Sequence, residues 1–176
     1  MEPKPTAGGM SEFGDGLKRL TVWVSDLKTS RDREVRLITH SLGPCIGLVY
    51  YDPALPAAGM LHFQLPSSKN HERRAQENPC MFADTAIPLL LRKMEGLGAV
   101  RDRMIVSVFG GASMLQDDTI FKIGIQNARA AKKILWQQCV SVAHEDVGGN
   151  SSRTVSIAIG TGRLNLRKNG KDYFYG

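Results

Sequence analysis

Residues 37–68, LITHSLGPCIGLVYYDPALPAAGMLHFQLPSS, carry the clearest fold signal in the chain. β-Branched and aromatic side chains dominate three runs in and around this stretch, at 35–39, 46–51 and 59–65, and short turns containing glycine or proline separate them. The pattern is typical of β-strands joined by tight turns, and antiparallel pairing would place the second and third strands side by side. We therefore expect a strand, a tight turn that carries a cysteine, a second strand, a turn, and a third strand that carries a histidine.

Similar runs continue through the rest of the chain, with two helical stretches between them. The further strand-like runs lie at 20–24, 104–109, 140–144, 154–159, 163–167 and 172–175. Apolar residues recur at helical spacing at 82–97 and at 122–138. Because the strands arrive in groups rather than alternating with helices, the sequence predicts an α+β fold: a single domain of packed, mostly antiparallel β-sheet with two main helices.

Residues 1–18 differ from the rest of the chain. They are rich in glycine, proline and charge and contain few large apolar side chains, which predicts a disordered leader followed by one folded domain at 19–176. The N-terminus lacks the positive start and apolar stretch of a secretory signal, and no apolar run approaches the length of a membrane span. We therefore expect a cytoplasmic protein with no direct membrane insertion.

Composition narrows the classes of partner. Apolar residues make up 42% and charged residues 23% of the 176 residues, which is ordinary for a globular domain. The formal net charge of +6 would suit an acidic partner such as a nucleic acid. The basic clusters contain no interleaved aromatic residues of the kind that bind single strands, so we interpret them as solvated faces and expect no nucleic-acid binding.

The three cysteines are Cys45, Cys80 and Cys139. Their number is odd, and none stands in a CxxC pair or beside a histidine at zinc spacing. We therefore expect no disulfide framework, no metal site and no cofactor. Each cysteine is either a small core residue or a reactive thiol, and we assign Cys80 and Cys139 to packing.

Cys45 and His62 form the candidate catalytic pair. Cys45 directly follows Gly43 and Pro44, so the turn can present its sulfur at the end of a strand, where backbone amides can face a developing oxyanion. Adjacent antiparallel strands would bring His62 close to this sulfur, and an imidazole beside a thiol favours the thiolate and takes up its proton. From the residues alone, a buried structural cysteine and a satisfied core histidine remain an alternative interpretation.

The motifs along the chain resemble those of the CheD family, the chemoreceptor glutamine deamidases. The resemblance rests on six segments in the same order as in the family: LITHSLGPC (37–45), GMLHFQLP (59–66), FADTAI (82–87), FGGASML (109–115), IGIQNARAAKKIL (123–135) and HEDVGGNSSRTV (144–155). Together they span about residues 20 to 170. One departure is Pro44, which stands where the family usually has serine and which removes a backbone N–H from the turn.

The resemblance implies a protein-glutamine glutaminase. It assigns Cys45 as nucleophile, His62 as general base and Thr39 as a residue that assists the pair. Cys45 would convert glutamine on the cytoplasmic domain of a chemotaxis receptor to glutamate through a thioester, with release of ammonia. It also implies a CheC-type phosphatase as a partner. The alternatives are an adaptor that docks this phosphatase with weak or lost catalysis, and an esterase that hydrolyses receptor glutamyl methyl esters through the same thioester.

Overall fold

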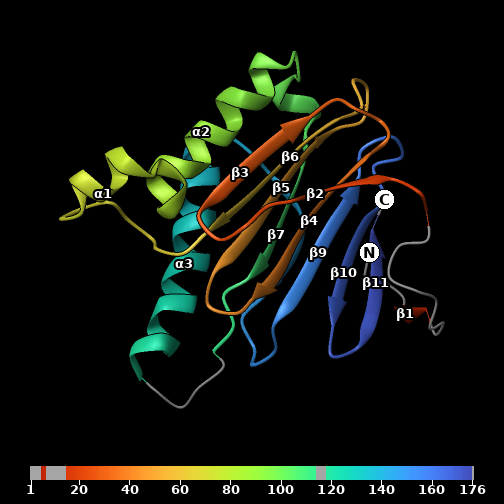
Figure 1. Cartoon of the computed structure of the whole chain (residues 1–176). Helices are drawn as coiled ribbons and strands as arrows, with labels where there is room; N and C mark the ends of the chain where they lie inside the picture. Colours follow the sequence, from red (N-terminus) through yellow and green to blue (C-terminus); the bar gives the residue numbers. More distant parts are fainter. Residues whose placement is uncertain (1–4, 7–14, 114–117, 176) are drawn as a thin grey trace.

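The computed structural model describes residues 5–6, 15–113 and 118–175, which form three layers (Figure 1). Two β-sheets pack face to face, and the helices cover the outer face of one of them (Figure 1). The predicted α+β fold with mostly antiparallel pairing is confirmed.

The first sheet has six strands in the order β1-β11-β10-β9-β4-β2. Their bounds are β1 Pro5–Thr6, β2 Lys18–Thr21, β4 Val35–Leu42, β9 Arg153–Ala158, β10 Leu164–Lys168 and β11 Lys171–Tyr175. All neighbours are antiparallel except β2 and β4, which are parallel. A hairpin turn at 159–163 connects β9 to β10, and Gly162 takes a φ of +72° there.

The second sheet has five strands in the order β3-β6-β5-β7-β8. Their bounds are β3 Asp26–Ser30, β6 Ala57–Phe63, β5 Ile46–Asp52, β7 Ile105–Gly110 and β8 Val142–Val147. Consecutive strands β4 and β5 therefore belong to different sheets, so the turn that carries Cys45 crosses from one sheet to the other.

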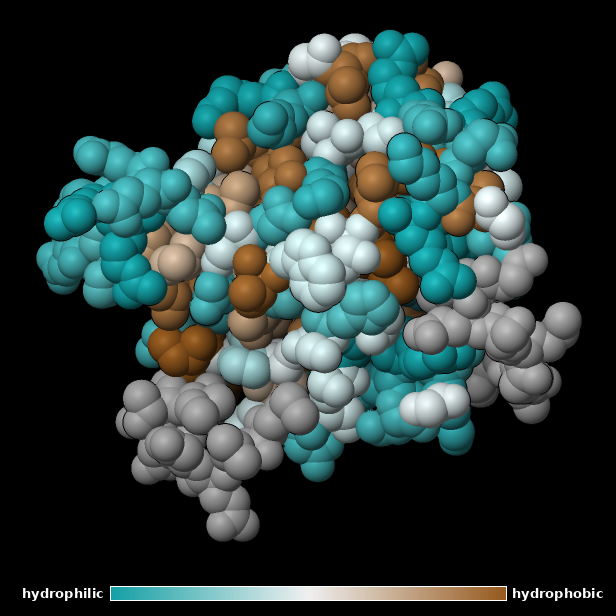
Figure 2. Space-filling view, in the orientation of Figure 1, coloured by the Kyte–Doolittle hydropathy of each residue, from teal (hydrophilic) through white to brown (hydrophobic). Residues whose placement is uncertain are grey.

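The α-helices are α1 Glu72–Glu77, α2 Ala83–Gly96 and α3 Asp118–Gln137, and two 3-10 turns lie at Pro79–Met81 and Arg101–Arg103. Helices α2 and α3 pack on the five-stranded sheet, with α2 over β6 and α3 over β5 and β7. The short helix α1 buries no residue and projects from the body as a hydrophilic lobe (Figure 2). Within the described residues, no helix is long and apolar enough to cross a membrane.

Two apolar cores hold the layers together. One fills the space between the five-stranded sheet and the helices, with Phe63 and Leu90 among its fully buried side chains. The other lies between the two sheets and includes Leu37, Phe109 and Ile157. Strands β5 and β7 contribute to both cores, which explains why their sequences are almost continuously apolar rather than alternating.

Several elements differ from the sequence-based expectations. Strand β3 and helix α1 were not predicted, and β2 begins at Lys18 and ends at Thr21 rather than covering 20–24. In the predicted leader, Pro5 and Thr6 pair with β11, while residues 1–4 and 7–14 lie outside the described part of the chain.

Candidate active site

Cys45 occupies the turn between β4 and β5. The end of β4 is irregular, with a register shift between Thr39 and Leu42, and Ser41 takes a left-handed φ of +56°. The Gly43 amide then donates to the Ser41 carbonyl over 2.9 Å, which closes the turn. This geometry leaves Cys45 half-buried at the start of β5.

The Gly110–Gly111 pair supports this turn from the end of β7. The Gly111 amide donates to the Cys45 carbonyl over 2.8 Å, and the Ala112 amide donates to the Gly43 carbonyl over 2.7 Å. Gly110 has a φ of +115°, and a Cβ at this position would lie 2.1 Å from the Cys45 carbonyl oxygen. A side chain here would displace the turn, so the glycine is needed for close backbone approach.

His62 reaches the same region from β6. In the antiparallel β5–β6 ladder it pairs with Gly47, two residues after Cys45, as expected for adjacent strands. Its Nδ1 lies 2.8 Å from Oγ1 of Thr39, which is fully buried on β4 of the other sheet. Its Nε2 is buried and has no hydrogen-bond partner among the described residues.

Burial keeps both members of the candidate pair neutral. It lowers the pKa of His62 to about 4, because no carboxylate compensates for the loss of water around the ring. Burial also raises the pKa of the Cys45 thiol, an effect that a hydrogen bond from the residue's own backbone amide partly offsets. At neutral pH the pair therefore rests as thiol and neutral imidazole rather than as a preformed thiolate and imidazolium.

A cavity of about 300 Å³ opens over Cys45 and His62. The other residues that line it are Val22, Trp23, Val24, His40 and Ser41. Trp23 and Val24 are exposed, so the rim of the cavity is apolar. Simple alternation along β4 predicts that His40 faces away from this site; it instead lines the cavity, because the irregularity after Thr39 redirects the strand.

A family model and several curated relatives match this chain. The family model described as CheD chemotactic sensory transduction matches residues 64–168. The chain belongs to the CheD family. Among CheD relatives, the probable chemoreceptor glutamine deamidase CheD of Solibacter usitatus is 46% identical over 88% of this chain and 92% of its own. The probable chemoreceptor glutamine deamidase CheD 1 of Syntrophus aciditrophicus is 42% identical, over 85% of this chain and 93% of its own.

Among solved structures, this CheD-family chain is similar to a Neisseria meningitidis protein, with a TM-score of 0.41 and 11% identity over 92% of this chain and 76% of that one.

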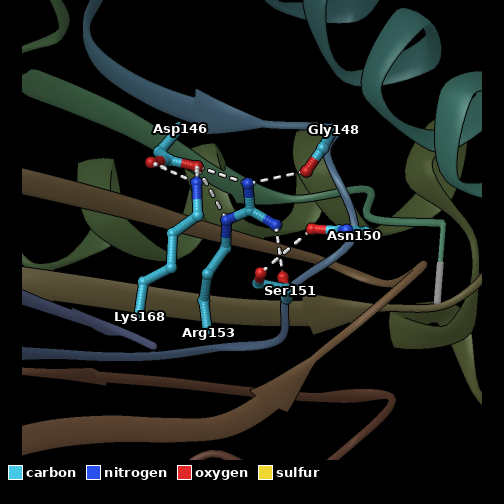
Figure 3. A network of polar contacts seen from close by, with 6 residues as sticks. All are labelled: Asp146, Gly148, Asn150, Ser151, Arg153 and Lys168. Atoms are coloured by element: carbon cyan, nitrogen blue, oxygen red, sulfur yellow. Dashed lines mark hydrogen bonds and ion pairs between the residues drawn. The ribbon is translucent and has the colours of Figure 1, made fainter. Parts of the chain in front are cut away.

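The HEDVGGNSSR segment of this CheD-family chain forms a charged network (Figure 3). The side chain of Arg153 is 1% exposed, and its Nε donates to Asp146 over 2.8 Å. Its Nη1 donates to the Ser151 carbonyl over 2.8 Å, and its Nη2 donates to the Gly148 carbonyl over 2.7 Å. Lys168 donates to both oxygens of Asp146 over 3.0 and 3.1 Å. The interpretation of Asp146 as a structural ion pair, rather than a metal ligand, fits these contacts.

This network connects to the turn that carries Cys45. The Gly148 amide donates to the Gly110 carbonyl, and the Ser113 amide donates to the Gly149 carbonyl, both over 2.8 Å. Arg153 therefore fixes the loop that packs on Gly110, which in turn packs on Cys45.

The other two cysteines differ in burial. Cys80 is half-buried against the core, as predicted. Cys139 is exposed, with a φ of +57° in the turn after α3, so its assignment to packing was wrong. No group of His, Cys, Asp and Glu able to hold a metal ion occurs within the described ranges.

Sequence reasoning missed one buried polar residue of the site. Asn127 lies in the helix predicted at 122–138, where its low helix propensity only weakens the helical pattern. In the structure it is fully buried, and its Nδ2 donates to the carbonyls of Pro44 and Gln64. Its place in the IGIQN segment was the available signal, since a buried asparagine inside an apolar helix face requires hydrogen-bond partners.

Proposed function

We propose that this protein is a glutamine deamidase that acts on chemotaxis receptors, with Cys45 as nucleophile, His62 as general base and Thr39 as the residue that orients His62. One observation carries the proposal: His62 Nε2 is left without a partner, among the described residues, beside a cavity that Cys45 also lines. The names of the CheD relatives, which are probable chemoreceptor glutamine deamidases, support the same reaction.

The contact with Thr39 is compatible with the tautomer of His62 that catalysis requires. When Nδ1–H donates to Thr39 Oγ1, Nε2 carries the lone pair and can accept a proton. Because the pKa of His62 is about 4, this neutral form is the one present at physiological pH. His62 therefore acts as a base during attack and does not need to hold the Cys45 thiolate beforehand.

The acylation step follows from this arrangement. His62 Nε2 takes the thiol proton as Cys45 Sγ bonds to the side-chain amide carbon of glutamine, which forms a tetrahedral oxyanion. Because Pro44 has no N–H, the amide of Cys45 is the donor that the turn itself offers to this oxygen. The protonated Nε2 then gives its proton to the departing nitrogen, ammonia leaves and a thioester remains.

The second half regenerates the enzyme. His62 Nε2 accepts a proton from water as its oxygen attacks the thioester carbon. The carbon–sulfur bond breaks, the proton returns to the Cys45 sulfur, and glutamate is released. Thr39 holds the ring in one orientation throughout both halves.

The names of the CheD relatives support the proposed substrate, and the motif resemblance is the ground for the proposed partner. We propose that the glutamine lies on the cytoplasmic domain of a chemotaxis receptor and that a CheC-type phosphatase binds this chain. A pull-down with purified phosphatase tests the second statement, and absence of binding by the folded protein would contradict it.

Ammonia release from a purified receptor cytoplasmic domain tests the activity. Cys45→Ala should abolish ammonia release and the matching conversion of glutamine to glutamate in peptide mass spectra. Cys80→Ala is the matched control, since Cys80 is also half-buried but lies away from the cavity, and it should retain activity. Full activity in Cys45→Ala would overturn the proposal.

A further inference from the structure

We infer that Asn127 is a positioning residue that holds the nucleophile turn and the end of the base-bearing strand in one fixed relation. This inference rests on the proposed function, because it concerns the alignment of Cys45 with His62.

The contacts of Asn127 place it between the two catalytic segments. Its side-chain nitrogen lies 2.9 Å from the carbonyl oxygen of Pro44 and 2.7 Å from that of Gln64. Pro44 directly precedes Cys45, and Gln64 follows two residues after His62. One amide group therefore joins the nucleophile turn to the end of β6.

The chemistry of this position calls for an amide. Both acceptors are carbonyl oxygens, so the bridging group must present two donors from one atom at the length of an asparagine side chain. Serine offers one donor, and aspartate in its charged form offers none. Leucine has nearly the same shape but cannot donate.

Asn127 is a poor choice for stability alone. Asparagine has low helix propensity, and the residue lies within the twenty-residue helix α3 with no exposed surface. Its Oδ1 is buried and, within the described part of the chain, has no hydrogen-bond partner, which costs free energy. Because Asn127 costs stability, we interpret its role as holding the two segments in a fixed position.

Helix α3 approaches the site closely enough to act as a rigid base. A Cβ on Gly124, one turn before Asn127, would lie 2.7 Å from the Gly111 carbonyl oxygen. Gly111 in turn donates to the Cys45 carbonyl. The helix thus touches the support beneath Cys45 through Gly124 and the segments on either side of the site through Asn127.

The contacts of Asn127 should couple its effect on Cys45 to the presence of His62. Without the two donors, the β5–β6 ladder, in which Ile46 pairs with Phe63, would still join the two strands, but the turn before β5 would lose its link to Gln64. The distance between Cys45 Sγ and His62 Nε2 would then vary more. Both hydrogen bonds that Asn127 donates go to backbone carbonyls of other residues, not to the Cys45 thiol or the His62 ring, so its effect on the thiol should depend on the presence of His62.

The test is the alkylation rate of Cys45 by iodoacetamide at pH 7, read by mass spectrometry, in wild type, Asn127→Leu, His62→Gln and the double variant. We expect Asn127→Leu to slow alkylation about tenfold when His62 is present and less than about twofold when it is absent. Leu135→Ala is the matched control, since it removes a buried side chain from the same helix and should lower stability without slowing alkylation.

Urea unfolding of each variant checks that it is folded. If Asn127→Leu does not fold, Asn127→Ser, which retains one donor, replaces it, with an intermediate loss expected. Unchanged or faster alkylation in the folded variant, or an equal loss with and without His62, overturns the inference alone. Full ammonia release by Cys45→Ala overturns the proposed function, and the inference with it.

Discussion

Two polar clusters join the same pair of sheets and serve opposite purposes. Thr39 on β4 meets His62 on β6, and Arg153 on β9 meets Asp146 on β8. Each contact therefore links the six-stranded sheet to the five-stranded sheet. The arginine donates to two carbonyls and a carboxylate, whereas the histidine makes one hydrogen bond, and its Nε2 has no partner among the described residues.

The two clusters also differ in charge: Asp146 is ionised and His62 is neutral. Burial alone would raise the pKa of Asp146, but hydrogen bonds from Arg153 and Lys168 outweigh it and hold the pKa below its usual value. Burial lowers the pKa of His62 with no opposing partner, so His62 stays neutral. The Arg153–Asp146 cluster, whose charges are paired and hydrogen-bonded, stabilises the loop. The neutral Thr39–His62 pair leaves one ring nitrogen without a partner among the described residues, and this nitrogen is available for proton transfer.

The largest expected effect comes from breaking the neutral cluster. His62→Gln should lower ammonia release about 10³-fold, equivalent to roughly 4 kcal/mol of transition-state stabilisation, because the base is lost. The free energy of unfolding at pH 7 should change by less than about 1 kcal/mol, since glutamine can still bond Thr39. Steady-state assays and urea unfolding on the same preparation measure both quantities.

Breaking the Arg153–Asp146 cluster should mainly lower stability rather than activity. Arg153→Met should lower the free energy of unfolding by about 3 kcal/mol, because it leaves the Gly148 and Ser151 carbonyls without their donor and weakens the pairing of Asp146. Lys168→Met is the matched control and should cost less, since the Lys168 side chain is 25% exposed. Equal losses of stability in the two variants would contradict the central place given to Arg153.

The two clusters lose their contribution to stability in different pH ranges. His62 has an ordinary pKa of 6.5 when unfolded and about 4 when folded, so the unfolded state binds the extra proton and stability falls as pH drops from 6.5 to 4. The loss attributable to His62 is on the order of 3 kcal/mol. Asp146 stabilises the fold above its unfolded pKa of 3.8, and its contribution is lost below that value.

Urea unfolding between pH 7 and pH 4 measures this difference. His62→Gln should flatten the pH dependence in that range. His144→Gln is the control, because burial also lowers the pKa of His144, which is less buried, and its removal should flatten the curve less. A curve for His62→Gln parallel to that of wild type would show that the ring is not held neutral.

The smallest expected effect comes from Thr39→Val, which tests the role of Thr39. Thr39→Val keeps the shape of a fully buried side chain but removes the partner of Nδ1. Ammonia release should fall about tenfold, through kcat rather than KM, since His62 loses the hydrogen bond that orients its ring but stays in place. A change confined to KM would assign Thr39 to substrate binding instead.

Local signals were sufficient for most strands and for placing Cys45 near His62, whereas the catalytic roles of the two residues came from the resemblance to the family. The β5–β6 pairing that brings His62 beside Cys45 follows from two apolar runs and a short turn. Strand β3 was missed because its sequence, DLKTS, is polar and half-buried, and it becomes a strand only by pairing with β6.

The remaining features depend on tertiary structure. That β4 and β5 lie in different sheets is not visible in their sequences, nor is the irregularity that turns His40 into the cavity. The role of Asn127 depends on where α3 packs, which no helical periodicity reveals.

The central claim is that the Cys45 sulfur carries the acyl group of the substrate glutamine. Acid quenching of a reaction with receptor cytoplasmic domain, followed by proteolysis and mass spectrometry, tests it directly. The account predicts a thioester between the substrate glutamyl group and the Cys45 peptide, absent in Cys45→Ala and present in Cys80→Ala. Steady deamidation with no adduct on Cys45, or an adduct on another residue, would contradict it.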